Sequence, residues 1–259
     1  MVVVNDISAS SYKFEMLFNG RILSYGTCFF YRHGGKDFLV SNWHNFSGRN
    51  PETNRPLSKN AAIPDEVNVM IPLKGRFGFS GWARFRIKGE NEESLWLEHP
   101  LKNRIDVAIL EVNVPENLEP RYVSDIKNDP YLQLAVAGDV FVVGYPLGMA
   151  VAETLPLWKR ASFASEPGID VDELPKYLVD TATREGMSGS PVFARSGYVK
   201  GSYAVTGDPF EDNRPWSVGY KYSFIGIYSG RLGSDVFQAQ LGVVWKSRVI
   251  LEIIENSMS

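Results

Sequence analysis

The segment Thr183-Arg-Glu-Gly-Met-Ser-Gly-Ser-Pro-Val192 places Ser188 between Gly186 and Gly189, just before an apolar run. A serine hydroxyl is a weak nucleophile until a base takes its proton, and the oxyanion that then develops needs backbone N–H donors. Glycine allows backbone angles that other residues avoid and lets a substrate approach the main chain closely. The segment therefore predicts a turn that presents Ser188 as a nucleophile.

A histidine base for Ser188 must come from earlier in the chain, because His33, His44 and His99 are the three histidines and all precede it. His33 lies in an Arg-His-Gly-Gly turn and His99 in a polar loop, so we interpret both as surface residues. His44 follows the apolar run 37–43 and emerges at the end of a predicted strand. His44 is the candidate base; the alternative is a half-buried histidine without chemistry.

Asp106 is the candidate acid, because it opens the apolar run Val107-Ala-Ile-Leu110. A carboxylate at the mouth of a buried strand is costly without hydrogen-bond partners, and a histidine N–H can be such a partner. The alternative is a solvated aspartate at the start of a strand. The resulting order along the chain is His, Asp, Ser, which excludes the α/β-hydrolase order and matches the chymotrypsin order.

Segments in succession resemble the trypsin-like, or chymotrypsin-fold, serine peptidases. The similar segments are Gly26-Thr-Cys-Phe-Phe30 with Phe38-Leu-Val-Ser-Asn-Trp-His44, Asp106-Val-Ala-Ile-Leu110, Gly186-Met-Ser-Gly-Ser-Pro191 and Phe224-Ile-Gly-Ile-Tyr-Ser-Gly230. Gly138-Asp-Val-Phe-Val-Val-Gly-Tyr-Pro146 strengthens the likeness to the disulfide-free bacterial branch that includes the high-temperature-requirement proteases. The resemblance extends over nearly the whole chain.

The resemblance implies an all-β chain of two six-stranded antiparallel β-barrels with a C-terminal helix. Residues 1–116 would form the barrel that carries His44 and Asp106, and residues 117–259 the barrel that carries Ser188, with the helix at 246–257. Apolar residues alternate over 12–18 and 67–73, the period of half-buried strands, and the spacing turns helical after 245. Further strands are expected at 21–31, 37–42, 82–87, 94–98, 106–112, 139–144, 176–180, 190–194, 222–229 and 241–245.

The resemblance also implies binding roles. The backbone N–H groups of Gly186 and Ser188 would form the oxyanion hole. Ala182 would lie at the base of the primary specificity pocket, and the stretch Ser229, Gly230 and Arg231 would pair with the substrate as an added strand. Without a carboxylate at position 182, we expect an uncharged residue before the cut, but Arg231 leaves this preference open.

Met187 departs from the digestive enzymes of the family, which have an acidic residue before the nucleophile. A thioether cannot pair with an N-terminal ammonium, so the oxyanion turn must be held by packing and backbone hydrogen bonds, or be ordered by substrate or a partner. Two loops, 48–57 and 165–174, are rich in turn residues. Loops of this size often rim a site, and surface decoration is an equal alternative.

Composition supports one catalytic unit without a cofactor. The net charge of −3 argues against a nucleic-acid or anionic-membrane surface, and three scattered histidines with one cysteine argue against a metal site. Cys28 cannot form an internal disulfide and is expected to be a buried thiol. The N-terminal residues do not resemble a signal peptide, and we expect a cytoplasmic protein.

The sequence thus predicts a serine endopeptidase acting on polypeptides through an acyl-enzyme. Two alternatives are a catalytically silent peptide-binding module on the same barrels and an esterase. The oligomeric state is left open by the sequence.

Overall fold

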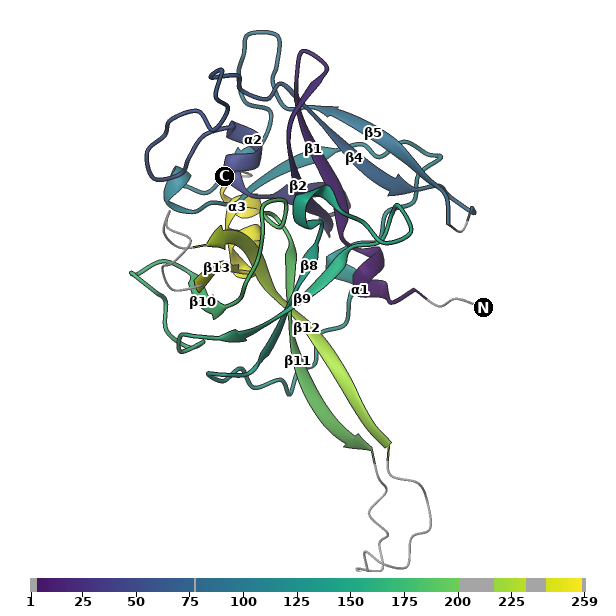
Figure 1. The fold of residues 1–259 in the computed structure, drawn as a ribbon, viewed down its shortest axis with the longest axis vertical. Coiled ribbons are helices and arrows are strands. Elements are labelled where there is room, and N and C mark those ends of the chain that lie inside the picture. The colour runs from purple at the N-terminus through teal and green to yellow at the C-terminus, as the bar shows by residue number, and fades with distance from the viewer. Residues whose placement is uncertain (1–3, 77, 201–216, 232–240, 258–259) are drawn as a thin grey trace, which may run out of the picture.

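The computed structural model describes residues 4–76, 78–200, 217–231 and 241–257 (Figure 1). Strands of the N-terminal half form one antiparallel sheet in the order β5-β4-β1-β2-β3-β7-β6. Its strands are β1 Tyr12–Phe18, β2 Arg21–His33, β3 Lys36–Ser41, β4 Glu66–Pro72, β5 Ser80–Arg86, β6 Leu97–Glu98 and β7 Ala108–Val112.

Strands of the C-terminal half close into a barrel in the order β10-β13-β12-β11-β8-β9. They are β8 Asp139–Gly144, β9 Leu157–Phe163, β10 Lys176–Asp180, β11 Pro191–Lys200, β12 Ser217–Arg231 and β13 Leu241–Lys246. The helices are α1 Asp6–Ala9, α2 Trp43–Ser47 and α3 Arg248–Ser257, with single turns η1 Lys102–Arg104, η2 Val123–Asp125 and η3 Pro146–Gly148. The all-β class, this barrel and the C-terminal helix are confirmed.

The N-terminal half differs from the prediction, because its seven strands do not close into a six-stranded barrel. The edge strand β6 has only two residues, and it pairs with β7. Between β5 and β6 the chain folds back on itself: Lys88 bridges Ser94, and the Leu95 N–H donates to the Ile87 carbonyl at 3.1 Å. A local loop therefore joins the two edges where a closing ladder would run.

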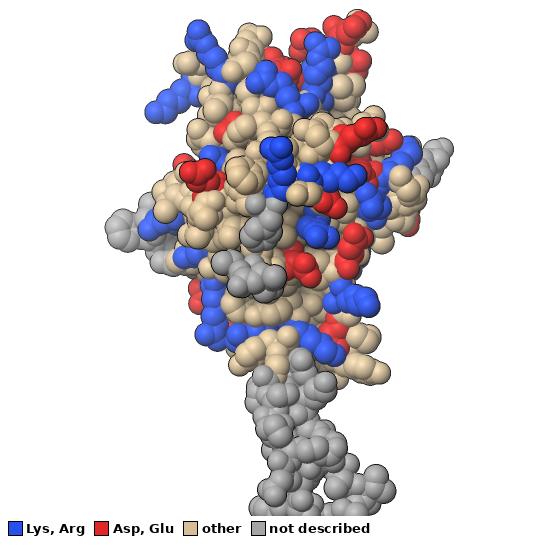
Figure 2. Space-filling model, turned by 90° about the vertical axis from the view of Figure 1, so that its right-hand side faces the viewer, with Lys and Arg blue, Asp and Glu red and all other residues tan. Residues whose placement is uncertain are grey.

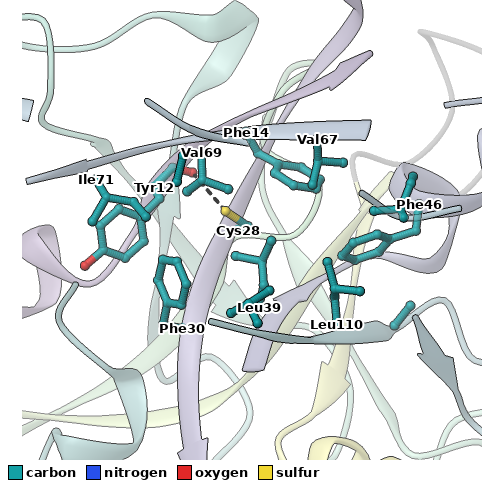
Figure 3. Close-up of a cluster of buried hydrophobic side chains, with 14 of the residues drawn as sticks. Tyr12, Phe14, Cys28, Phe30, Leu39, Phe46, Val67, Val69, Ile71 and Leu110 are labelled. Carbon is teal, nitrogen blue, oxygen red and sulfur yellow. Dashed lines mark hydrogen bonds between the residues drawn. The ribbon is translucent and has the colours of Figure 1, made fainter. Parts of the chain in front are cut away.

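Alternating burial explains the strands of this sheet. In β4, Val67, Val69 and Ile71 are buried while the residues between them are partly exposed, the two-residue period of a strand. Their side chains pack with Phe14 and Cys28 (Figure 3). Burial raises the pKa of the Cys28 thiol, and its Sγ lies 3.9 Å from the Tyr12 carbonyl oxygen. Cys28 is thus a packing residue, as predicted.

A second hydrophobic cluster joins the two halves and holds the site together. It contains Phe29 and Val40 of the first sheet, Val143 and Phe193 of the barrel, and Ile250 of α3. The aromatic rings of Phe29 and Phe224 meet edge to face with centroids 5.5 Å apart. Because β3 leads to His44 and β11 follows Ser188, this shared core fixes the distance between candidate base and nucleophile.

Basic and acidic side chains are interspersed on the face shown in Figure 2, so that face carries no extended field of one sign. Within the described parts of the chain, no helix has the length and apolar character needed to cross a membrane.

Candidate active site

His44 lies at the start of a short helix rather than at the end of a strand. After β3, Asn42 is buried and its side-chain amide donates to the Asp106 carbonyl at 2.7 Å. The chain then enters α2, which ends at Gly48 in the left-handed region, φ 64°, where the Gly48 N–H donates to the His44 carbonyl. The Trp43 indole N–H donates to Glu98 Oε2 at 2.7 Å. These bonds set the direction in which the imidazole leaves the backbone.

Asp106 holds His44 through both of its carboxylate oxygens. Oδ2 lies 2.7 Å from His44 Nδ1, and Oδ1 accepts the His44 backbone N–H at 2.9 Å. The two side chains are 15% and 5% exposed, so little water competes for the pair. With the Nδ1 proton directed at the carboxylate, Nε2 is the ring nitrogen left to accept a proton.

Ser229 supplies a third hydrogen bond to the same carboxylate, because its Oγ donates to Asp106 Oδ2. Sequence reasoning assigned Ser229 only a substrate-pairing role and missed this support. Asp106 and Ser229 are 123 positions apart, so only the fold brings them together. The Asp106 carboxylate therefore ties the N-terminal sheet to the β12 strand of the barrel at the candidate site.

The Ser188 turn requires both of its glycines. Gly186 and Gly189 have φ angles of 88° and 86°, which side-chain-bearing residues rarely adopt. A Cβ at Gly186 would lie 2.4 Å from the Tyr145 carbonyl oxygen, and one at Gly189 would lie 2.0 Å from that of Thr27. The turn is therefore pressed against β2 and the β8–η3 corner, and the predicted need for glycine has a steric cause in each case.

Ser188 is held in place through its backbone, and its hydroxyl lies within hydrogen-bond distance of a backbone carbonyl of β12. The Ser188 carbonyl accepts the Thr27 N–H at 2.9 Å and the Asn45 side-chain amide at 3.3 Å. The Oγ donates to the Ser229 carbonyl at 3.4 Å, and within the described residues no hydrogen bond joins it to His44. Catalytic hydrogen bonds are often long or misaligned before substrate binds. The described residues therefore do not show the hydrogen bond between Ser188 and His44 that transfer of a proton would need.

The candidate oxyanion donors are the backbone N–H groups of Gly186 and Ser188, and the carbonyl of each of these two peptide units accepts a hydrogen bond. The Glu185 carbonyl accepts the Leu147 N–H at 2.6 Å, and the Met187 carbonyl accepts the Ser190 N–H at 3.1 Å. Because the C=O and N–H of a trans peptide point in opposite directions, the N–H groups of Gly186 and Ser188 face away from these contacts. Met187 is 0% exposed and packs in the barrel core.

The other residues predicted to contact the substrate differ in how close they lie to the triad candidates. Gly230 is close to the nucleophile, since a Cβ built on it would lie 3.9 Å from Ser188 Oγ. Ala182 and Arg231 are exposed, and among the described residues no hydrogen bond links either to the triad candidates. The residue that fills the barrel beside Ser229 is Tyr228, buried and hydrogen-bonded to Thr183, with burial raising its pKa to about 12.

The trypsin-like peptidase domain matches residues 26–201, and no curated protein matches. The M. tuberculosis protease Rv3671c in its inactive form has 17% identity and a TM-score of 0.50, over 96% of this chain and 89% of that one.

A serine endoprotease from Yersinia pestis has 10% identity and a TM-score of 0.52, over 99% of this chain and 67% of that one. The HtrA-type protease AlgW with a tripeptide has 11% identity and a TM-score of 0.50, over 99% and 64%. At such identities these structures support the fold alone. The domain match spans more than half of the chain, which therefore belongs to the trypsin-like peptidase family and is a serine peptidase.

Proposed function

We propose that this chain is an endopeptidase in which His44, Asp106 and Ser188 act as a triad and form an acyl-enzyme. The observation that carries the proposal is the pair of hydrogen bonds that His44 donates to Asp106, at 2.7 Å from the ring nitrogen Nδ1 and 2.9 Å from the backbone N–H. An aspartate in this position fixes the imidazole tautomer and stabilises the cation that forms when Nε2 takes a proton.

In the proposed reaction, the Ser188 hydroxyl turns from the Ser229 carbonyl toward His44 as a peptide binds. His44 takes the hydroxyl proton while Oγ attacks the carbonyl carbon, and the Gly186 and Ser188 N–H groups receive the oxyanion. His44 then gives the proton to the leaving amine. Water attacks the acyl-enzyme by the same route in reverse, which releases the acid and restores Ser188.

The chain offers a matched control for the nucleophile. Ser190 lies two residues on, and its Oγ is buried without a hydrogen-bond partner in the described residues. We expect Ser188→Ala to lose fluorophosphonate labelling and to reduce peptide hydrolysis by about 10⁴- to 10⁶-fold, the effect of dismantling a triad. Ser190→Ala should label and turn over substrate as the unsubstituted protein does.

The same experiment separates the alternatives. A silent peptide-binding module would not be labelled at all, and an esterase would be labelled but would cleave only esters. Retention of most peptide hydrolysis by folded Ser188→Ala protein would contradict the triad.

A further inference from the structure

We propose that Thr27 is a positioning residue, whose side-chain hydroxyl holds the nucleophile turn in the orientation that receives the oxyanion. Thr27 lies in β2 of the N-terminal sheet and is fully buried. Its Oγ1 donates to the Gly186 carbonyl at 2.8 Å, from one half of the molecule to the other. The inference rests on the proposed function, because Thr27 would act on the reaction through the proposed oxyanion donors of Gly186 and Ser188.

The two partners of the Thr27 hydroxyl fix the direction of its proton. Oγ1 accepts the Tyr145 backbone N–H at 3.1 Å and lies 2.8 Å from the Gly186 carbonyl oxygen. A backbone N–H can only donate and a carbonyl oxygen can only accept, so the hydroxyl proton points at Gly186. Thr27 therefore joins the corner after β8 to the nucleophile turn. Loss of this one oxygen would deprive two buried backbone groups of their partner, which is costly.

The bond from Thr27 holds the central one of three successive peptide units in the turn. The carbonyls of the units before and after it accept backbone N–H groups from Leu147 and Ser190. The central unit joins Gly186 to Met187, and its carbonyl is the one that Thr27 holds. This unit lies between the two units that carry the proposed oxyanion donors. Its rotation would therefore change the direction of both donors.

The central unit has few other restraints. Gly186, at its start, has a φ of 88° and lacks the side chain that limits backbone rotation elsewhere. The Met187 N–H donates to the Arg184 carbonyl at 3.4 Å, and the Met187 side chain packs in the barrel core without a charge that could anchor the turn. The 2.8 Å bond from Thr27 is shorter than the bond to Arg184 and restrains the unit more strongly.

Thr27 is itself held firmly enough to act as an anchor. Its backbone N–H donates to the Ser188 carbonyl at 2.9 Å, and its own carbonyl accepts the Ser41 hydroxyl at 2.8 Å. A Cβ on Gly144 would lie 2.6 Å from Thr27 Oγ1, so the glycine there makes room for the hydroxyl. The branched side chain of threonine restricts rotation about χ1. The hydroxyl thus meets the turn from a fixed position.

Substitutions that differ by a single oxygen test the role of the hydroxyl. Thr27→Val keeps the shape of the side chain and removes the oxygen, whereas Thr27→Ser keeps the hydroxyl and removes the methyl group. Thr27→Ala then differs from Thr27→Ser by the oxygen alone. Ser11→Ala is the matched control: the buried Ser11 Oγ also donates to a carbonyl of the other half at 2.8 Å, but that carbonyl belongs to Val143 of β8 instead of the turn.

The substrate is an alanyl, valyl or leucyl tripeptide p-nitroanilide, whichever the unsubstituted protein cleaves fastest. We expect Thr27→Val and Thr27→Ala to lower kcat by about 10- to 100-fold with little change in KM, a smaller loss than removal of an oxyanion donor itself causes. Thr27→Ser should restore most of kcat. Ser11→Ala should lower Tm, as Thr27→Val does, and should leave kcat at its original value.

Binding of a transition-state analogue separates positioning from a merely structural role. When a peptide aldehyde binds, Ser188 Oγ bonds to the aldehyde carbon, His44 takes the hydroxyl proton and the aldehyde oxygen becomes an oxyanion. The peptide alcohol with the same side chains binds without that charge. Thr27→Val should raise the inhibition constant of the aldehyde by the factor by which it lowers kcat/KM, and should leave that of the alcohol unchanged.

Three results would overturn the proposal: an unchanged kcat in Thr27→Val or Thr27→Ala protein, equal losses of affinity for aldehyde and alcohol, or a loss of kcat in Ser11→Ala as large as in Thr27→Val. If neither Thr27→Val nor Thr27→Ala protein folds, Thr27 is a structural residue and the proposal is wrong. Failure of the proposed function looks different, because fluorophosphonate would then not label Ser188 in the unsubstituted protein.

Discussion

Asn45 connects the base-bearing helix to the nucleophile at the scale of a single residue. Its side-chain amide donates to Ser41 Oγ at 2.9 Å and to the Ser188 carbonyl at 3.3 Å. Its Nδ2 lies 2.9 Å from where a Cβ on Gly26 would stand, so a glycine there makes room for it. Because the amide is buried, replacing it leaves the Ser188 carbonyl with one donor fewer in a site that water reaches poorly.

We therefore expect Asn45→Ala to lower kcat by about tenfold with little change in KM, because it shifts the nucleophile without touching the binding strand. The matched control is Asn68→Ala, which removes a side-chain amide bonded to Glu15 and Arg84 on the first sheet. Both variants should lose about 1 to 2 kcal/mol of stability. If Asn45→Ala and Asn68→Ala slow fluorophosphonate labelling equally, Asn45 has only a structural role.

Some residues of the candidate site carry a local sequence signal, and others do not. His44, Asp106 and Ser188 each follow or begin a local apolar pattern, so each could be found without knowing the fold, and their roles stay predictions. Ser229 and Asn45 carry no such local signal, because their partners Asp106 and Ser188 are more than a hundred positions away. Long-range hydrogen bonds of this kind follow only from tertiary structure.

At the scale of elements, the missed features have local physical causes. Strand β9 was not predicted because Lys159 and Arg160 interrupt its apolar pattern, yet it pairs with β8 from Gly144↔Leu157 to Asp139↔Ser162. Arg160 lies outside the barrel and bonds to Asp139 of the neighbouring strand, which accounts for its charge. Helix α2 was read as the end of a strand, because five residues are too few to show a helical period.

The loop 165–174, whose role the sequence left open, is tied to the barrel by a buried cation. Lys246 Nζ lies 2.7 Å from Asp170 Oδ1 and donates to the Pro167 and Ile169 carbonyls. Arg248 bonds the other Asp170 oxygen. The hydrogen bond from Lys246 is the main cause that lowers the pKa of Asp170 below its usual range. These contacts give the loop a structural role at the end of β13 and the start of α3.

This ion pair predicts a pH-dependent stability. The pKa of Asp170 is lower in the folded state than in the unfolded state. The stability that Asp170 contributes is therefore fully present at pH values above the ordinary pKa of aspartate, and it is lost as the pH falls through the pKa of the folded state. Asp170→Asn should lower Tm at pH 7 by about 2 to 4 °C, for a contribution of about 1 kcal/mol from a partly exposed carboxylate.

At pH values below the pKa of Asp170 in the folded protein, the Tm difference between Asp170→Asn and the unsubstituted protein should vanish. Asp172→Asn, which changes an exposed carboxylate paired with Lys176, should change Tm little at either pH. A Tm difference for Asp170→Asn that is independent of pH would contradict the ion-pair account.

At the scale of the whole molecule, the two halves depend on one another. The boundary near 116 stays a prediction, which falls between the end of β7 at Val112 and the start of β8 at Asp139. Across it, Phe29 and Phe38 of the sheet share a hydrophobic cluster with Phe193 and α3 of the other half. A pattern of strands can predict two β units. It cannot show that the first closes its edges with a loop, since that depends on a two-residue strand and a few backbone bonds.

The segment before β1 packs in this shared core, so we expect its removal to lower the stability of the protein. Ile7 of α1 is 4% exposed within the cluster, Ser11 Oγ donates to the Val143 carbonyl at 2.8 Å, and the Trp158 indole donates to Ser8 Oγ at 2.8 Å. In the digestive enzymes that the chain resembles, a new N-terminus pairs with an acidic residue before the nucleophile. Met187, buried and uncharged, offers no such partner.

Removal of residues 1–11 should therefore lower stability without raising activity. Ile7→Ala alone is expected to cost about 2 to 5 kcal/mol, because it leaves a cavity in the shared core. Active-site titration at 25 °C should give no more reactive sites for the trimmed protein than for the full-length one, and Ile7→Ala should match the latter while its Tm falls. In the full-length chain the Gly186 and Ser188 N–H groups face away from the hydrogen bonds that hold the turn. We therefore expect that removing the N-terminal residues brings no further ordering of the proposed oxyanion hole. A clear rise in titrated sites on trimming would show instead that cleavage near the N-terminus activates this peptidase.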